Sequence, residues 1–501
     1  MAKIKLKVGQ IVALAVMAIV LAALIVGDVM AYSYASIITT FFGSGEQLGG
    51  DAAAIEEAAK SGDELVRKMG NEGVVLMKNE MGEDGEPTLP LDKNGDGSPI
   101  KVNIFGWGAT DAGFLLAGNG SGRSYVHPDM KVTLLDAFKQ NGFEYNEEII
   151  GIYEDWCTTE DADWGENANW GNRYNTKLKE PVTDTAFPAD VRERAKEYSD
   201  TAIIVLSRYS GEYIGRIYDY QPKHDLDRDD TRSFNEISTE EESLIKMCTE
   251  NFENVIVVFN TGSIMDMTFL DDPSFGKIDA AMNVGYMGQS GATAIPKILS
   301  GEVNPSGKLA DTVIYDPEVN EITRLNGESS DIVYIEDVYI GYKWYETAGV
   351  EGWYDGKTKF GKTGYDAVVQ FPFGSGLSYT TFEWELLDVS IESGGNIDKD
   401  SVIDIQVRVE NTGDVPGKDV VELYLTAPYE DGGIEKPHVA LLDFEKTEEI
   451  QPGDYDVVEF SITAYELASY DCYDANENII TGWELEGGTY QLKLMTDAHN
   501  L

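Results

Sequence analysis

A glutamate that follows a buried strand is the clearest candidate for chemistry in this sequence. The apolar run at residues 202–206 leads into Ser207-Arg208-Tyr209-Ser210-Gly211-Glu212. In an open parallel sheet, ligands bind beyond the carboxyl ends of the strands, so Glu212 would lie at a binding edge. A carboxyl group there could exchange a proton with a reacting group, and Arg208 and Arg216 could tune its pKa. On position alone, Glu212 equally fits an ordinary surface acid, because the chain holds 89 acidic residues.

Two other segments could shape a binding site. The loop Gly118-Asn119-Gly120-Ser121-Gly122 precedes a predicted helix, and a glycine-rich loop before a helix can cradle a phosphate. Its spacing matches neither common nucleotide-binding pattern, which favours a structural turn. The polar segment at residues 156–184 carries Trp156, Trp164 and Trp170. Their rings could stack on sugars or lie half-buried in a surface insertion.

The elements around these segments indicate an α/β domain. Continuous apolar runs are typical of strands buried on both faces of a parallel sheet. Such runs occupy residues 102–105, 202–206, 255–259 and 278–284. Helical segments fall between them, at residues 133–140 and from Ser238 or Thr239, with Glu241 and Glu242 in the first turn. This order predicts a layered helix–sheet–helix domain.

After Phe382 the hydrophobic period changes to two. Apolar side chains alternate with polar ones along residues 402–410, and residues 420–425, 457–462 and 490–495 follow the same pattern. Glycine, proline and aspartate separate these segments. Strands of period two at short spacing predict an all-β sandwich as a second domain.

Composition excludes several classes of function. The chain has 501 residues and a formal net charge of −51, and a field of that sign repels nucleic acid. The three cysteines and four histidines have no metal-ligand spacing. We therefore expect no metal site and no nucleic-acid partner.

The N-terminus has the pattern of a membrane anchor. Lys3, Lys5 and Lys7 precede residues 8–27, which are apolar except for Gln10 and long enough to span a bilayer. The lysines predict a cytoplasmic N-terminus and a single-pass protein whose bulk is extracytoplasmic. A cleaved signal peptide and a secreted product are the alternative. We assign residues 1–42 to this segment and 43–64 to a tether and the start of a helix, where Ser61-Gly62-Asp63-Glu64 indicates a capping box.

A series of motifs runs along the chain in a characteristic order. They are Glu72-Gly73-Val74-Val75-Leu76-Met77-Lys78-Asn79, residues 118–122, residues 288–309, residues 339–345, residues 371–379 and, in the sandwich, residues 411–413, 420–424 and 467–471. Together these motifs resemble the C-terminal half of glycoside hydrolase family 3, the β-glucosidase and β-xylosidase family, and the resemblance covers nearly everything from about residue 65 onward. It implies an α/β domain at 65–380, an immunoglobulin-like, fibronectin type III-like domain at 381–501, and no metal or organic cofactor.

The resemblance implies that Glu212 is the general acid/base. Many family members carry this residue in a Ser-Gly-Glu-Gly-x-Asp-Arg loop, and this chain keeps Ser210-Gly211-Glu212 but has Tyr213 and Gly215 where the family has Gly and Asp. The other residues expected at the site, as substrate contacts, are Arg208, Gly120, Ser121, Trp164 and Trp170.

The family's nucleophile, an Asp of a Ser-Asp-Trp motif on a TIM barrel, has no counterpart that we can identify. Glu154-Asp155-Trp156 and Ala162-Asp163-Trp164 lie in the polar segment and read as chance matches. We therefore expect the front half of a reversed-order enzyme, with the barrel supplied in cis or in trans and a β-linked oligosaccharide or glycoside as substrate. The alternative is a non-catalytic module that binds carbohydrate or acts as a scaffold.

Overall fold

The computed structural model describes Met17 and residues 52–82, 85–91, 98–117, 126–158, 180–208, 232, 235–316, 334, 336–391 and 394–501. The chain divides into two units, Met1–Gly62 and Asp63–Leu501. Helix α3 (Ala52–Gly73) is continuous, so the prediction that Ser61 caps a new helix is wrong. No helix among the described residues is both long and apolar enough to cross a membrane. The predicted span at residues 8–27 lies outside them, apart from Met17.

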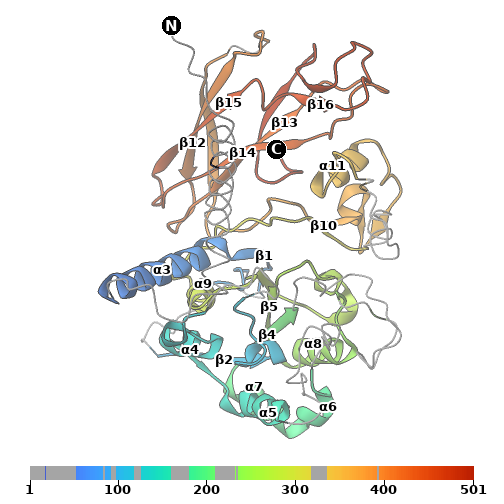
Figure 1. Cartoon of the computed structure of the whole chain (residues 1–501). Helices are drawn as coiled ribbons and strands as arrows, with labels where there is room; N and C mark the ends of the chain where they lie inside the picture. Colours follow the sequence, from blue (N-terminus) through green and yellow to red (C-terminus); the bar gives the residue numbers. More distant parts are fainter. Residues whose placement is uncertain are drawn as a thin grey trace. The chain divides into compact units, whose positions relative to one another are not determined.

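A six-stranded sheet forms the centre of the α/β domain, in the order β1-β6-β5-β4-β2-β3. Its strands β1, β2, β4 and β5 are labelled in Figure 1. All neighbours pair in parallel except β1, which is antiparallel to β6. The predicted parallel sheet is therefore confirmed. Its strands are β1 (Val75–Asn79), β2 (Ile100–Phe105), β3 (Phe143–Tyr145), β4 (Thr201–Arg208), β5 (Asn254–Thr261) and β6 (Ala280–Asn283).

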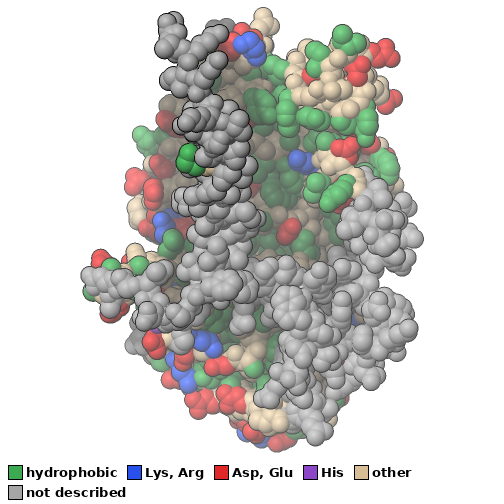
Figure 2. All heavy atoms as spheres, in the orientation of Figure 1, with side chains coloured by type: hydrophobic (Ala, Val, Ile, Leu, Met, Phe, Trp, Pro, Cys, Tyr) green, Lys and Arg blue, Asp and Glu red, His purple; other side chains and the backbone are tan. Residues whose placement is uncertain are grey.

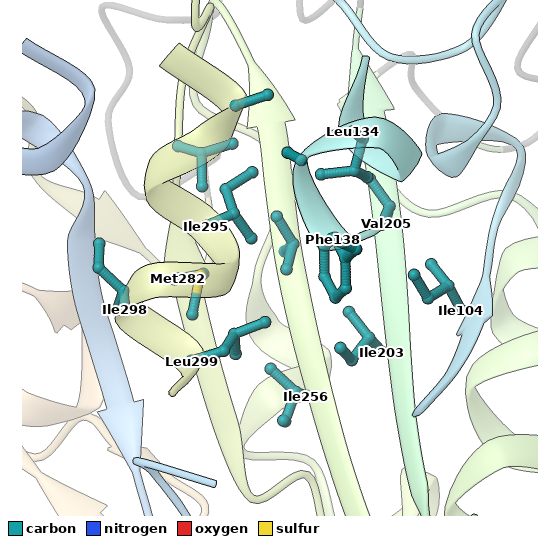
Figure 3. Packing of buried hydrophobic residues seen from close by; sticks show 14 of the residues in the cluster. Ile104, Leu134, Phe138, Ile203, Val205, Ile256, Met282, Ile295, Ile298 and Leu299 are labelled. Carbon is teal, nitrogen blue, oxygen red and sulfur yellow. The ribbon is translucent and has the colours of Figure 1, made fainter. Parts of the chain in front are cut away.

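Helices cover both faces of this sheet, and the central strands are buried throughout. On β4, Ile203 and Val205 face one core and Ile204 and Leu206 face the other. Figure 3 shows the first core, where Ile203 and Val205 lie among residues from α4 (Leu134–Gln140) and α9 (Ala294–Leu299). The second core is formed with α5 (Glu147–Cys157), α7 (Ala189–Tyr198) and α8 (Thr239–Asn251). The remaining described elements of this domain include α6 (Thr183–Ala186), α11 (Tyr342–Val350), β7 (Val313–Ile314), β8 (Thr358–Lys359), β9 (Lys362–Thr363) and β10 (Val369–Phe371).

The C-terminal part is a sandwich of two three-stranded sheets, β11-β12-β15 and β14-β13-β18, with a separate hairpin β16-β17. The predicted alternation on β12 is confirmed, because Ile403, Ile405, Val407 and Val409 are buried in the shared core. The strands are β11 (Phe382–Val389), β12 (Val402–Asn411), β13 (Val420–Thr426), β14 (Ala440–Lys446), β15 (Tyr455–Thr463), β16 (Ser469–Asp471), β17 (Gly482–Glu484) and β18 (Gln491–Met495).

Strand β13 departs from the predicted one-sided pattern, because residues 420–425 are all buried. Its second face meets segments that precede the sandwich. The Tyr424 ring lies 6.1 Å from the Tyr342 ring, which stacks on Phe373 at 4.5 Å. Glu422 accepts a hydrogen bond from the Tyr424 hydroxyl at 2.6 Å, and a side chain at Gly374 would collide with the Glu422 carboxylate. The prediction of an exposed polar face therefore fails for this strand.

An ion-pair cluster also joins the two domains. Glu72, at the end of α3, contacts the ammonium groups of Lys418 and Lys446, each at 2.7 Å. The Lys446 ammonium also donates to the Glu72 carbonyl oxygen at 3.1 Å. One carboxylate of the α/β domain thus binds two lysines of the sandwich.

Candidate active site

The carboxyl ends of β2, β4, β5 and β6 meet at one edge of the sheet, which is where open α/β sheets bind ligands. Asn260, fully buried on β5, organises this edge. Its Nδ2 donates to the carbonyl oxygens of Leu115 at 3.0 Å and Gly285 at 2.6 Å, and its Oδ1 accepts from the Leu115 N–H at 2.6 Å and the Ser207 hydroxyl at 3.2 Å. Only an amide offers both the donors and the acceptor, so one side chain ties the segments after β2 and β6 to β4 and β5.

Sequence reasoning missed Asn260. The available signal was a polar residue directly after the apolar run at residues 255–259. A buried amide must be hydrogen-bonded, so its position in a central strand points to partners in neighbouring loops.

Arg208, predicted to bind substrate, lies at the end of β4 in a buried ion pair. Its guanidinium forms two hydrogen bonds to Glu241, at 2.7 and 2.6 Å, and donates to the carbonyl oxygens of Ser207 and Glu236. Glu241 also accepts from the Ser238 N–H and completes the capping box of α8, which confirms the predicted start of that helix. The pair therefore anchors the end of β4 to the start of α8.

A second buried acid organises the segment after β2. Glu180 accepts hydrogen bonds from the Tyr153 hydroxyl at 2.5 Å and the Trp107 N–H at 2.9 Å, while the Gly106 N–H donates to the Tyr153 oxygen at 2.8 Å. Burial raises the pKa of Glu180 to about 8, although these hydrogen bonds act in the opposite direction. Nothing in the polar segment singled this glutamate out, because its burial depends on residues far away in the sequence.

A cavity of about 220 Å³ opens beyond the ends of β5 and β6. It is smaller than the ~300 Å³ at which ligand pockets typically begin. Lys308 and Asp311 are the ionisable residues in its lining, and burial raises the pKa of Asp311. The other walls come from residues 73, 75, 261–264, 267, 283–285, 309, 310 and 313.

The remaining predicted site residues, Glu212, Gly120, Ser121, Trp164 and Trp170, lie outside the described residues. Their roles stay predictions. Within the part of the chain that the structure describes, no group of three or more His, Cys, Asp or Glu side chains is arranged to hold a metal ion.

Comparison with known proteins gives consistent matches. Residues 74–379 match the glycosyl hydrolase family 3 C-terminal domain, and residues 419–498 match the fibronectin type III-like domain. A beta-glucosidase of Ruminococcus albus is 30% identical over 438 residues, covering 87% of this chain and 40% of that protein. Beta-glucosidase A of Butyrivibrio fibrisolvens is 32% identical over 449 residues, covering 86% and 49%.

Among solved structures, a beta-glucosidase from Paenibacillus barengoltzii superposes with a TM-score of 0.70 at 30% identity, covering 87% of this chain and 42% of that one. The chain thus spans less than half the length of these relatives. The resemblance seen in the motifs is confirmed, and the chain belongs to glycosyl hydrolase family 3, whose C-terminal domain its residues 74–379 represent.

Proposed function

We propose that this chain supplies the acid/base half of a retaining, β-glucosidase-type glycoside hydrolase, with Glu212 as the general acid/base. The observation that carries the proposal is the anchored end of β4. Arg208 is fixed there by Glu241, at the binding edge of the sheet, and Glu212 follows four residues later in the chain. The two relatives described above are beta-glucosidases, which supports the same reaction class.

In the proposed reaction, Glu212 protonates the oxygen of the leaving group and later removes a proton from water. A retaining mechanism also needs a nucleophilic carboxylate about 5–5.5 Å from the acid/base. We assign that carboxylate to a barrel domain in cis or in trans. Arg208 acts as a positioning residue through the β4–α8 ion pair, and Gly120, Ser121, Trp164 and Trp170 form the rim that contacts a β-linked glycoside.

The decisive test is Glu212→Gln in the enzyme completed with its barrel. General acid/base assistance typically contributes 10²–10⁴-fold, so kcat should fall by about that factor for substrates with poor leaving groups. The loss should shrink for good leaving groups, and azide should partly restore turnover. Glu197→Gln, at an exposed position on α7, is the matched control and should leave activity unchanged.

Unchanged activity of Glu212→Gln on a poor leaving group would overturn the assignment. The 501-residue chain by itself should not hydrolyse aryl β-glucosides above background, because it lacks the partner carboxylate. Hydrolysis by the chain alone would contradict the two-part mechanism. Failure of both the completed enzyme and its variants would favour a non-catalytic carbohydrate-binding or scaffolding module.

We also propose an extracytoplasmic protein held at the membrane by residues 8–27. Lysines before a stretch that is apolar except for Gln10 support this orientation. Alkaline extraction of membranes followed by N-terminal sequencing tests it. The protein should stay in the pellet with its N-terminus intact, and a soluble product that begins after residue 30 would show a cleaved signal and secretion instead.

A further inference from the structure

An exposed aromatic cluster lies on the β16-β17 hairpin of the sandwich. Tyr470 and Trp483 face each other across the two strands, and the Trp483 ring lies 5.4 Å from the Tyr470 ring and 5.5 Å from the Tyr465 ring. We call these three residues the β16-β17 aromatic cluster. Trp483 is 55% exposed and Tyr465 is 62% exposed. Figure 2 shows hydrophobic side chains beside acidic ones around the hairpin that carries β16 in Figure 1.

The hairpin that carries Tyr470 and Trp483 is fixed by several contacts. Leu467, just before β16, is buried in the sandwich core. The buried carboxylate of Asp471 accepts hydrogen bonds from the Tyr473 N–H at 2.9 Å and the Ala475 N–H at 2.8 Å. Asn476 and Asn478 both donate to Glu484 at the end of β17. A preorganised surface loses little conformational entropy when it binds a ligand, and large exposed aromatic patches commonly mark binding sites.

The charge around the hairpin limits what can bind. Between Lys446 and Lys493 the chain has eleven acidic residues and no lysine, arginine or histidine. This field repels nucleic acid and anionic lipid, and it also opposes a second copy of a chain with a net charge of −51. A neutral sugar chain meets no such barrier, and its hydroxyl groups can donate hydrogen bonds to carboxylates.

We propose that the β16-β17 aromatic cluster binds a neutral polysaccharide, at a site separate from the carboxyl edge of the α/β sheet. The face of an aromatic ring carries negative charge density, which attracts the weakly positive C–H groups on the face of a pyranose ring. Trp483 supplies the stacking platform, and the Tyr465 and Tyr470 rings, inclined to it by 53° and 74°, border that platform. The choice of a β-glucan as the ligand rests on the proposed function, whereas the preference for a neutral chain rests on the hairpin itself.

Affinity electrophoresis of the full chain tests this site. The protein should be retarded in gels that contain a neutral mixed-linkage β-glucan and not in gels that contain carboxymethylcellulose or no polysaccharide. Trp483→Ala should weaken glucan binding about 10-fold, as expected for the loss of one aromatic stacking contact. The matched control is Trp353→Ala, because Trp353 is 61% exposed but lies outside the hairpin. It should bind as the unchanged protein does.

Circular dichroism and the thermal midpoint establish that each variant is folded. Trp483→Phe keeps an aromatic face and should retain most of the glucan binding. Tyr465→Ala should also weaken glucan binding, and it leaves the pairing of β16 with β17 intact because Tyr465 lies outside both strands. The proposal is overturned if neutral glucan does not retard the protein, if Trp483→Ala and Trp353→Ala behave alike, or if the anionic polymer binds equally well. Sedimentation that shows a dimer lost with Trp483→Ala would assign the cluster to self-association and would also overturn it.

Failure of this proposal is distinguishable from failure of the proposed function. Glucan binding requires no catalysis, so Glu212→Gln should be retarded like the unchanged protein. Conversely, Trp483→Ala in the barrel-completed enzyme should hydrolyse a small aryl glucoside normally.

Discussion

Replacing Glu180 by glutamine should change how the stability of the α/β domain depends on pH. The folded pKa of Glu180 is about 8, above its ordinary value of 4.5, because the carboxyl group is buried. Between these values the folded protein holds a proton that the unfolded chain has released, so stability falls as pH rises. The stabilisation is fully present below about pH 4.5 and is lost by about pH 8. Each pH unit between the two pKa values lowers the free energy of unfolding by about 1.4 kcal/mol, so the total loss is at most about 5 kcal/mol.

Glutamine imitates the protonated carboxyl group. Its oxygen can accept from the Trp107 N–H, and its Nε2 can donate to the Tyr153 oxygen as a protonated carboxyl group would, which turns the Tyr153 hydroxyl from donor to acceptor in both cases. We therefore expect Glu180→Gln to match the unchanged protein near pH 5 and to exceed it in stability near pH 8, by about 2–5 kcal/mol.

Urea unfolding at several pH values measures this difference, with amide exchange in the peptide that contains Gly106 and Trp107 as a local readout. Glu193→Gln, on the exposed side of α7, is the control and should leave the pH profile unchanged. If Glu180→Gln and the unchanged protein have parallel pH profiles, the carboxyl group is charged in the folded state and the reasoning fails. Glu180→Ala should destabilise at every pH, because it leaves two buried donors without an acceptor.

Two further substitutions test the contacts that hold the site and the domains. Arg208→Lys should lower the stability of the α/β domain by about 3 kcal/mol, because lysine cannot make both hydrogen bonds to Glu241. Urea unfolding measures this loss, and an unchanged unfolding midpoint would contradict the anchoring role of Arg208. Glu72→Ala should leave Lys418 and Lys446 without their shared carboxylate and cost about 1–3 kcal/mol. Limited proteolysis should then cut between the domains faster, and equal cleavage rates would show that the cluster does not hold them together.

Much of the fold could be predicted because its signals are local. Strands buried on both faces must be apolar throughout, so residues 202–206 and 255–259 could be recognised as strands. The Ser238–Glu241 capping box marks the start of α8 within four residues. The pattern of residues 420–425 correctly predicted a strand but wrongly predicted that one of its faces is exposed. The second face of β13 packs against Tyr342 and Phe373, whose proximity no local pattern encodes.

The candidate site was less predictable for the same reason. Arg208 pairs with Glu241, which lies 33 positions away in the sequence. Asn260 forms hydrogen bonds with Leu115, which lies 145 positions away. Glu180 illustrates the limit most clearly, because a single glutamate in a polar segment gives no sign that it will be buried. The family motif around Glu212 singled out a candidate functional residue, whose role stays a prediction.

Because both faces of β13 are buried, the sandwich depends on the α/β domain for part of its packing. If it were grafted onto an unrelated protein, the outer face of β13 would lose the aromatic cover from Tyr342 and Phe373, and water would reach Tyr424 and Glu422. Burial now raises the pKa of Glu422 to about 7, and that carboxyl group would return to the behaviour of an ordinary surface acid. Substitutions on this face of the strand are therefore constrained by the α/β domain that packs against it.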